Sequence, residues 1–200
     1  MTGMTDTYSG KYFDFIRQGL EQMEVTDIHG NGMSPDRGFD LWAGRAEQIK
    51  QNTKGLLFFC GNGASASMAE HMSHDWFQNA MVNTTTCAEV SHITAISNDI
   101  SYEEVFRYRV RRILSEKDML VAVSSSGNSA NIVNAVQAAK ERMAFTVTVS
   151  GKESGNAIRR MGDLNFYVPL MHYGEVESAH ALLLHGALDY YLDKYMGGRH

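Results

Sequence analysis

The stretch that organises the chain is GLLFFCGNGASASMAEHMSHD, residues 55–75. It begins with a short apolar run next to glycine, which is typical of a buried parallel strand. The turn GNGAS follows, and its glycines leave backbone N–H groups uncovered. A helical pattern comes next. Because the amino end of a helix attracts anions, this strand–turn–helix unit predicts a phosphate site.

Two polar side chains of that helix are candidates for chemistry. His71 and Asp75 are four residues apart, so they share one helix face. An imidazole and a carboxylate in this arrangement suit general acid–base catalysis or the binding of a divalent metal ion. The alternative is that both are ordinary surface residues.

A second strand–turn–helix unit occurs at residues 118–142. The apolar run DMLVAV precedes the polar turn SSSGNS at residues 124–129. Hydroxyls and free N–H groups at a helix start suit a phosphomonoester, although one such turn is also common as a plain helix cap. No lysine follows either glycine turn as in a Walker A loop, and GNGAS lacks the dinucleotide fingerprint spacing. We therefore expect no nucleotide cofactor.

The remaining chain predicts an α/β fold. Strands are expected at residues 56–60, 84–90, 118–123, 145–150 and 164–169, and helices alternate with them. A turn or short helix is expected at residues 91–99, and SYEE at 101–104 resembles a capping box that opens a helix. This order predicts a doubly wound, Rossmann-like parallel sheet with helices on both faces and ligands at the carboxyl ends of its strands.

Two helices are expected before the first strand, at residues 8–23 and 35–52, with a loop at residues 26–33 between them. Ser34 and Pro35 suit the N-cap and first position of the second helix. Helices outside an α/β core often pack in an oligomer interface. We expect one domain over residues 1–200, with these helices in such an interface and the α/β core at about residues 55–196.

Composition and net charge limit the classes of partner that we expect. The formal net charge of −5 argues against a nucleic-acid partner. No apolar run approaches the roughly 20 residues of a membrane span, so no membrane partner is expected. No secretory signal is visible, so Cys60 and Cys87 are expected as free thiols in a cytoplasmic protein.

The last expected helix, residues 175–196, adds Glu177 and His185. Eight residues are a little over two turns, so the two can share a side of the helix. With His71 and Asp75 they make a plausible divalent-metal set, and the same four can serve as a base and an acid. A lone histidine in an apolar helix is also commonly a core residue, and spacing leaves these alternatives open.

Four segments together carry a family resemblance: GNGASASMAEHMSHD, VSHITAISNDISYEEVF, LVAVSSSGNSANIVNAVQAA and VTVSGKESGNAI. They resemble the sugar isomerase (SIS) domain family over about residues 8–195, and within it the phosphoheptose isomerase branch. The resemblance implies an aldose–ketose isomerase that converts sedoheptulose 7-phosphate to D-glycero-D-manno-heptose 7-phosphate through an ene-diol. It also implies a Zn²⁺ ion and a homotetramer with sites between subunits.

The same resemblance assigns roles to individual positions. It implies Asp75 and His185 as the catalytic pair. It implies a metal set made of His71, Asp75, Glu177 and His185. The substrate- and phosphate-binding positions it implies are Asn62, Gly63, Ser65, Asp99, Ser124, Ser125, Ser126, Ser129 and Glu177. The sequence departs from the family in two of these places, since the family has glutamate at position 75 and glutamine at position 177.

Two non-catalytic alternatives come from other classes of protein. A sensor domain that only binds a phosphosugar would keep the serine turns without needing the four side chains above. A SIS-domain protein that binds a protein partner, such as a replication initiator, would lack the acid–base pair. Because Asp75 and His185 are both present, the sequence favours an enzyme.

Overall fold

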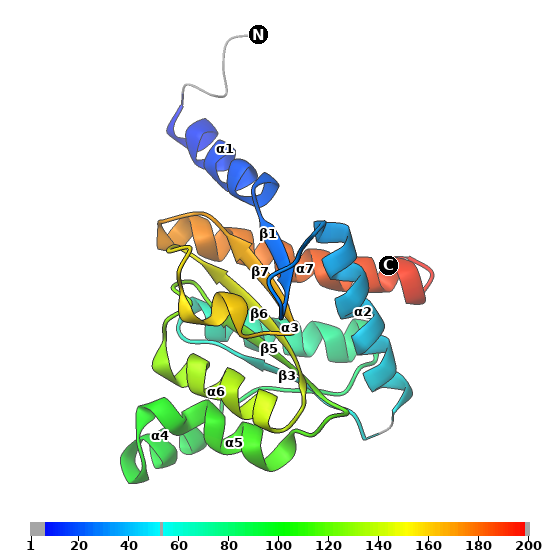
Figure 1. Cartoon of the computed structure of the whole chain (residues 1–200), viewed down its shortest axis with the longest axis vertical. Coiled ribbons are helices and arrows are strands. Elements are labelled where there is room, and N and C mark those ends of the chain that lie inside the picture. The colour runs from blue at the N-terminus through cyan, green and yellow to red at the C-terminus, as the bar shows by residue number, and fades with distance from the viewer. Residues whose placement is uncertain (1–6, 53, 199–200) are drawn as a thin grey trace.

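The computed structural model describes residues 7–52 and 54–198, and within them a sheet of seven strands carries helices on both faces (Figure 1). The strand order is β2-β1-β7-β6-β5-β3-β4. The parallel strands are β3 (Leu57–Cys60), β4 (Thr84–Thr85), β5 (Met119–Ser124), β6 (Phe145–Gly151) and β7 (Leu164–Val168). Their connections run through helices, which confirms the doubly wound α/β prediction.

One edge of the sheet corrects the prediction. The expected loop at residues 26–33 is wrong, because β1 (Glu24–Asp27) and β2 (Gly32–Met33) form an antiparallel hairpin. β1 also pairs antiparallel with β7. The carboxylate of Asp27 closes the turn by accepting the backbone N–H groups of His29 and Asn31, both at 2.9 Å. The glycines do mark a turn, but the residues on either side of it are strands, because β1 pairs with both β2 and β7.

The helices follow the predicted pattern closely. They are α1 (Tyr8–Glu21), α2 (Pro35–Gln51), α3 (Ala64–Ala80), α4 (Val90–Asp99), α5 (Val105–Ile113), α6 (Ala130–Glu141) and α7 (Tyr173–Tyr195), with the short 3₁₀ segments η2 (Tyr102–Glu104) and η3 (Ala157–Arg160). The side chain of Ser34 caps α2 as expected, accepting the N–H of Arg37 at 3.3 Å. The strand expected at residues 84–90 is reduced to β4, and α4 begins at Val90.

The capping box expected at residues 101–104 does not form. Ser101 makes no side-chain cap bond, and η2 stands between it and α5. Glu104 is instead drawn to Arg107, whose guanidinium lies 3.3 Å from its carboxylate. This ion pair and the 3₁₀ turn replace the reciprocal bonds of the box.

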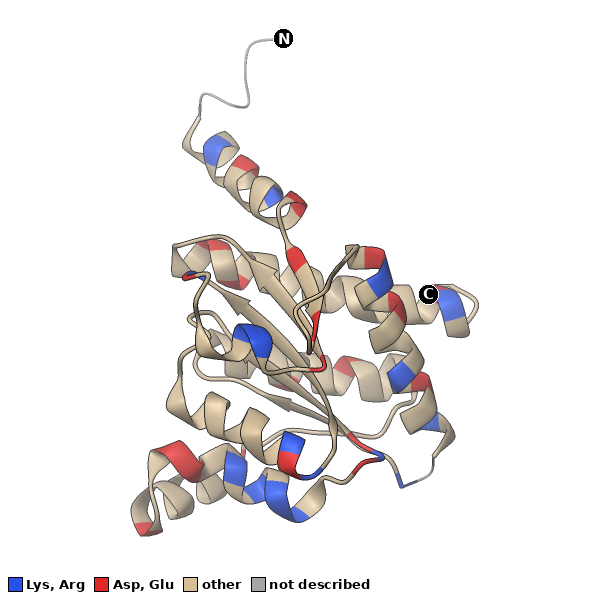
Figure 2. Cartoon of the chain, in the orientation of Figure 1, with Lys and Arg blue, Asp and Glu red and all other residues tan. Residues whose placement is uncertain are grey.

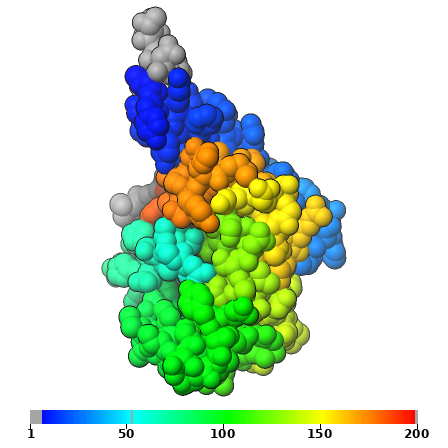
Figure 3. Space-filling view, turned by 90° about the vertical axis from the view of Figure 1, so that its left-hand side faces the viewer, coloured from blue at the N-terminus to red at the C-terminus, as the bar shows by residue number. Residues whose placement is uncertain are grey.

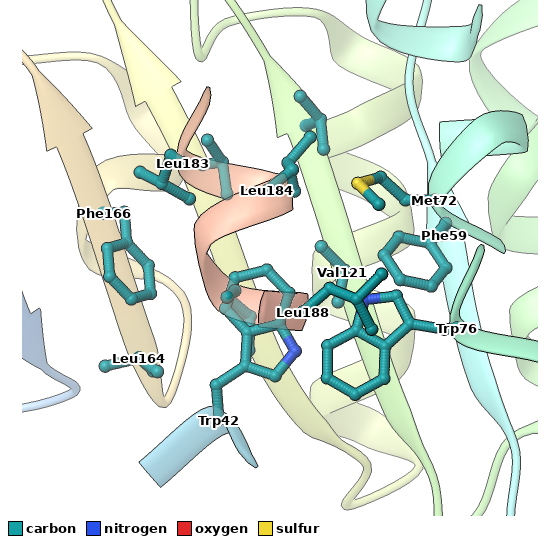
Figure 4. Packing of buried hydrophobic residues seen from close by; sticks show 14 of the residues in the cluster. Trp42, Phe59, Met72, Trp76, Val121, Leu164, Phe166, Leu183, Leu184 and Leu188 are labelled. Atoms are coloured by element: carbon teal, nitrogen blue, oxygen red, sulfur yellow. The ribbon is translucent and has the colours of Figure 1, made fainter. Parts of the chain in front are cut away.

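Two apolar clusters hold the layers together, one on each face of the sheet. Successive side chains of a strand point to opposite faces, so Phe59 and Val121 belong to the first cluster while Phe58 and Leu120 belong to the second. In the first cluster, α2, α3 and α7 pack together, and the ring of Trp42 on α2 stacks on the ring of Trp76 on α3, with ring centroids 6.5 Å apart (Figure 4). This packing fixes α3 and α7 side by side over the sheet.

The first helix stands apart from these layers. α1 projects from the body of the molecule (Figures 1 and 3). Tyr8, Phe13 and Phe15 of this helix are 85%, 59% and 53% exposed. The single domain and its interface helices stay predictions, and residues 1–6, 53 and 199–200 of that domain lie outside the described residues.

The cysteines and the helices bear on where the protein resides. Cys60 and Cys87 are free, as expected, and both are buried. In the part of the chain that the structure describes, no helix combines the length and the apolar character needed to cross a membrane.

Candidate functional site

The two polar turns meet in one pocket at the carboxyl edge of the sheet. The pocket has a volume of about 260 Å³. It is lined by Asn62, Gly63, Ala64, Ser65, Ser124, Ser125, Ser126, Ser129, Tyr173 and Glu177. We call it the serine pocket. Eight of the nine positions expected to bind substrate or phosphate lie here, because β3 and β5 are neighbours and their following turns share an edge.

Three helices begin at the serine pocket. Ala64 is the first residue of α3, Ser129 is the N-cap of α6, and Tyr173 is the first residue of α7. None of the three has a side-chain cap bond. Backbone donors in the first turn of a helix have no intrahelical partner. The pocket therefore gathers amide donors and positive helix ends, which favours an anion.

Backbone geometry explains the glycines of the two turns. Gly63 has φ +56° and Gly127 has φ +65°, a region that most other residues avoid. At Gly127 an added Cβ would also lie 1.9 Å from Oδ1 of Asn156. Glycine is therefore required at position 127 by conformation and by space.

A reciprocal amide pair joins the turns. The side-chain amide of Asn62 donates to Oδ1 of Asn131 at 2.8 Å, and that of Asn131 donates to Oδ1 of Asn62 at 2.9 Å. The hydroxyl of Tyr102 donates to the same Asn62 oxygen at 3.0 Å. These bonds orient Asn62 and fix the distance between the turns, so the pocket is formed before a ligand enters it.

Asp99 is the exception among the expected substrate contacts. It is exposed near the end of α4, where its carboxylate accepts the side-chain amide of Asn98 at 2.9 Å. It does not line the serine pocket of this chain. The segment after α4 instead contacts one of the pocket residues, through the hydrogen bond from Tyr102 to Asn62.

A second cluster lies farther along α3 and α7. Nε2 of His71 is 3.2 Å from Oδ2 of Asp75. The rings of His71 and His185 meet edge to face, with centroids 5.2 Å apart. One ligand atom from each of the three residues lies within 4.8 Å of the others. We call these three residues the histidine cluster; its two imidazoles and one carboxylate are a suitable donor set for Zn²⁺.

Glu177 is not part of the histidine cluster. It precedes His185 by eight residues on α7, which is about 12 Å of helical rise, and it lines the serine pocket. The expected four-ligand set is therefore not assembled within this chain. His185 is exposed, so it is not a core histidine. The fully buried histidine of α7 is His180.

Some residues of the site were not predicted from the sequence. Tyr173 was expected to precede the last helix, but it is the first residue of α7, which begins two residues earlier than expected. Asn131 stands in the recognised SSSGNSAN motif, and that motif was the available signal for it. The contact of Tyr102 with Asn62 crosses between distant segments and has no local sequence signal.

Comparison with known proteins places this geometry in a family. The model of the SIS domain matches residues 45–151. The phosphoheptose isomerase of Chromohalobacter salexigens is 33% identical over 148 residues, covering 68% of this chain and 74% of that protein. That of Neisseria meningitidis serogroup A is 35% identical over 145 residues, covering 68% of this chain and 73% of that protein.

A solved structure agrees with the sequence comparison. The phosphoheptose isomerase of Neisseria gonorrhoeae superposes with a TM-score of 0.76 at 26% identity, covering 91% of this chain and 94% of that one. The SIS model matches more than half of the chain, and the fold matches over nearly all of it. The chain therefore belongs to the SIS domain family and is related to the phosphoheptose isomerases within it.

Proposed function

We propose that this protein is an aldose–ketose isomerase that converts sedoheptulose 7-phosphate to D-glycero-D-manno-heptose 7-phosphate. The observation that carries the proposal is the pairing of an anion pocket with a histidine cluster along two packed helices, α3 and α7. The relatives that are named phosphoheptose isomerase support the same reaction.

The substrate phosphate binds in the serine pocket. Ser65, Ser124 and Ser125 are nearly buried, with 3%, 5% and 6% of their surface exposed. Hydrogen bonds to a charged group contribute more to binding at such a partly desolvated site than in water. Binding of the unreactive phosphate thus positions the reacting carbons, as remote binding energy does in other enzymes.

The distance between the two sites supports a long substrate. His71 follows Ala64 by seven residues, so it lies about 10 Å along the axis of α3. With bonds of about 1.5 Å in a zigzag, an extended seven-carbon sugar spans roughly 9 Å from phosphorus to C2. A triose phosphate spans roughly 4 Å on the same reckoning. The first length is comparable to the separation of the two sites along α3, and the second is much shorter.

The histidine cluster then supplies the proton transfers. Isomerisation removes a proton from one of C1 and C2 and delivers it to the other, with an ene-diol between them. Asp75 or His185 acts as the base, and the other moves the hydroxyl proton. His71 holds the Asp75 carboxylate in place through their 3.2 Å contact.

A Zn²⁺ ion is the metal that the donor set fits best, with His71, Asp75 and His185 as its protein ligands. When bound, such an ion polarises the substrate carbonyl and stabilises negative charge on its oxygen. Glu177 is left to contact sugar hydroxyls from the serine pocket. Elemental analysis of the purified protein tests the metal, and His71→Ala should lose it.

We also propose a homotetramer. A groove of about 820 Å³ runs between α1 and α7. Its apolar lining includes Tyr12, Phe13, Ile16, Leu20 and Leu182, and His185 borders it. Contiguous apolar surface of this kind marks an association site, and closed symmetric assemblies are the common outcome. Light scattering should give the tetramer mass, and Phe13→Glu should lower it; a monomeric parent protein at micromolar concentration would contradict the proposal.

A cytoplasmic location completes the proposal. It is supported by the two free, buried cysteines, which suit a reducing compartment. Fractionation of the source cells with an antibody would test it directly.

Incubation of the zinc-loaded protein with sedoheptulose 7-phosphate in D₂O, followed by NMR, tests the reaction. We expect isomerisation with deuterium at C1 or C2, and no exchange into dihydroxyacetone phosphate. Asp75→Asn and His185→Ala should abolish exchange, whereas His74→Ala, an exposed neighbour outside the histidine cluster, should not. No exchange with any ketose phosphate would favour a non-catalytic phosphosugar-binding protein.

A further inference from the structure

The turn after β6 contains a residue in an unusual backbone conformation. Lys152 has φ +56°, in the left-handed region. The other described non-glycine residues with positive φ are Met81 and Met143, which follow helices α3 and α6, where this conformation is a common way to end a helix. Lys152 follows a strand, so helix termination does not explain it.

The backbone of Lys152 is held on both sides. Its N–H donates to the carbonyl of Leu170 at 2.9 Å, and its own carbonyl accepts the hydroxyl of Tyr167 at 2.7 Å. Glycine would adopt this conformation without strain. Strained residues that the surroundings hold in place tend to occur at functional sites, where their side chain is used. The side chain of Lys152 is therefore the feature to explain.

That side chain lies against a residue that lines the serine pocket. Its ammonium group lies 3.9 Å from the ring centre of Tyr173, which lines the pocket. The backbone leads to the same place, since Ser150 pairs with Ser124 across β6 and β5, and the turns of residues 124–129 and 151–155 leave the sheet side by side. Figure 3 looks onto this edge, where the yellow segment after β6 borders the orange start of α7.

The charge of the serine pocket leaves a role for this ammonium group. Among the described residues that line the pocket there is no lysine or arginine, and the charged one is Glu177. A phosphate monoester is close to a dianion at neutral pH. Hydroxyls and helix ends favour it, but the Glu177 carboxylate repels it. The arginines concentrated on α5 (Figure 2) are held elsewhere, with Arg109 paired to Glu89 and Arg111 paired to Glu141.

We propose that Lys152 is the cation that pairs with the substrate phosphate and makes the site specific for phosphorylated sugars. Tyr173 holds the ammonium group beside the pocket through a cation–π contact, which is weak at an exposed position, and Tyr173 is 56% exposed. An incoming phosphate offers the ammonium group a stronger partner. The proposal rests on the phosphosugar function given above.

Binding of inorganic phosphate, measured by calorimetric titration of the full chain, tests the proposal independently of catalysis. Lys152→Gly removes the charge and keeps the left-handed backbone, so it should fold at least as well as the parent protein. We expect it to bind phosphate about tenfold more weakly. This is the lower end of the range for loss of a charge-assisted hydrogen bond, because Lys152 is only half-buried and solvent weakens its charge interactions. Lys152→Asn, which also tolerates this conformation, should show the same loss.

Two further variants separate charge from structure. Lys152→Arg keeps the positive charge and should retain most of the affinity. Lys117→Gln is the matched control, because it removes one charge from an exposed residue before β5, at the opposite edge of the sheet. It should bind phosphate as the parent protein does. In the kinetics, Lys152→Gly should raise KM for the phosphosugar about tenfold, whereas Lys152→Arg should leave KM close to that of the parent protein.

The outcomes distinguish this proposal from the proposed function. Unchanged phosphate affinity in Lys152→Gly and Lys152→Asn would overturn the role of Lys152, even in an active isomerase. A tenfold loss of phosphate affinity that Lys152→Arg restores would support it, even if the protein isomerised no sugar tested.

Discussion

The buried histidine His180 should make the protein sensitive to acid. It lies on α7 with no exposed surface. Burial lowers its pKa from 6.5 to about 4, and an interaction with the backbone of Ser150 opposes this shift. The neutral ring is tolerated in this position, and the charged ring is not.

The direction of the effect follows from this pKa. Because the folded-state pKa is below the unfolded value, the unfolded chain takes up the proton first as the pH falls. The contribution of His180 is complete above pH 6.5 and is lost between pH 6.5 and about pH 4. Each pKa unit corresponds to about 1.4 kcal/mol, so the full loss is about 3 kcal/mol and the loss at pH 5 is about 2 kcal/mol.

Urea unfolding at a fixed protein concentration measures this loss. The buried pair Trp42 and Trp76 provides a fluorescence signal. His180→Leu is the comparison, because it removes the titrating ring while the other histidines and the carboxylates stay. Relative to the parent protein, the variant should gain about 2 kcal/mol when the pH is lowered from 7.5 to 5. Parallel pH dependence in the two proteins would show that His180 is not the source of the acid sensitivity.

Three further substitutions test the pocket and its supports. Gly127→Ala should lower the free energy of unfolding by about 2 kcal/mol or more and weaken phosphate binding, because position 127 has a positive φ and the added methyl group would clash with Asn156. Gly155→Ala is the control: position 155 has open space around it, so this variant should be nearly neutral in thermal unfolding. Asp118→Ala should cost about 3 kcal/mol in urea unfolding, since its buried carboxylate accepts two backbone N–H groups and a hydroxyl. Ser126→Ala should weaken inorganic phosphate binding about tenfold in a titration. Unchanged values would contradict each prediction.

The elements whose signal is local could be predicted from the amino-acid sequence alone. The apolar run, glycine turn and helical pattern of residues 55–75 predicted β3, the turn at Gly63 and α3, and the second unit predicted β5 and α6. Strand, turn and cap preferences act over a few residues, so they can be recognised without the fold. The parallel order then placed both turns at one edge, which is where the serine pocket lies.

Contacts between distant groups depend on how the whole chain packs. β1 is a strand because it forms hydrogen bonds with β7, although the glycines and asparagine that follow it indicated a loop over residues 26–33. The packing of α3 against α7 brought His185 to His71 and Asp75, while the pitch of α7 left Glu177 in the serine pocket. Lys152 acquired its place beside Tyr173 through bonds to Leu170 and Tyr167. Such contacts join segments that share no local pattern, and only the packed fold sets the distances between them.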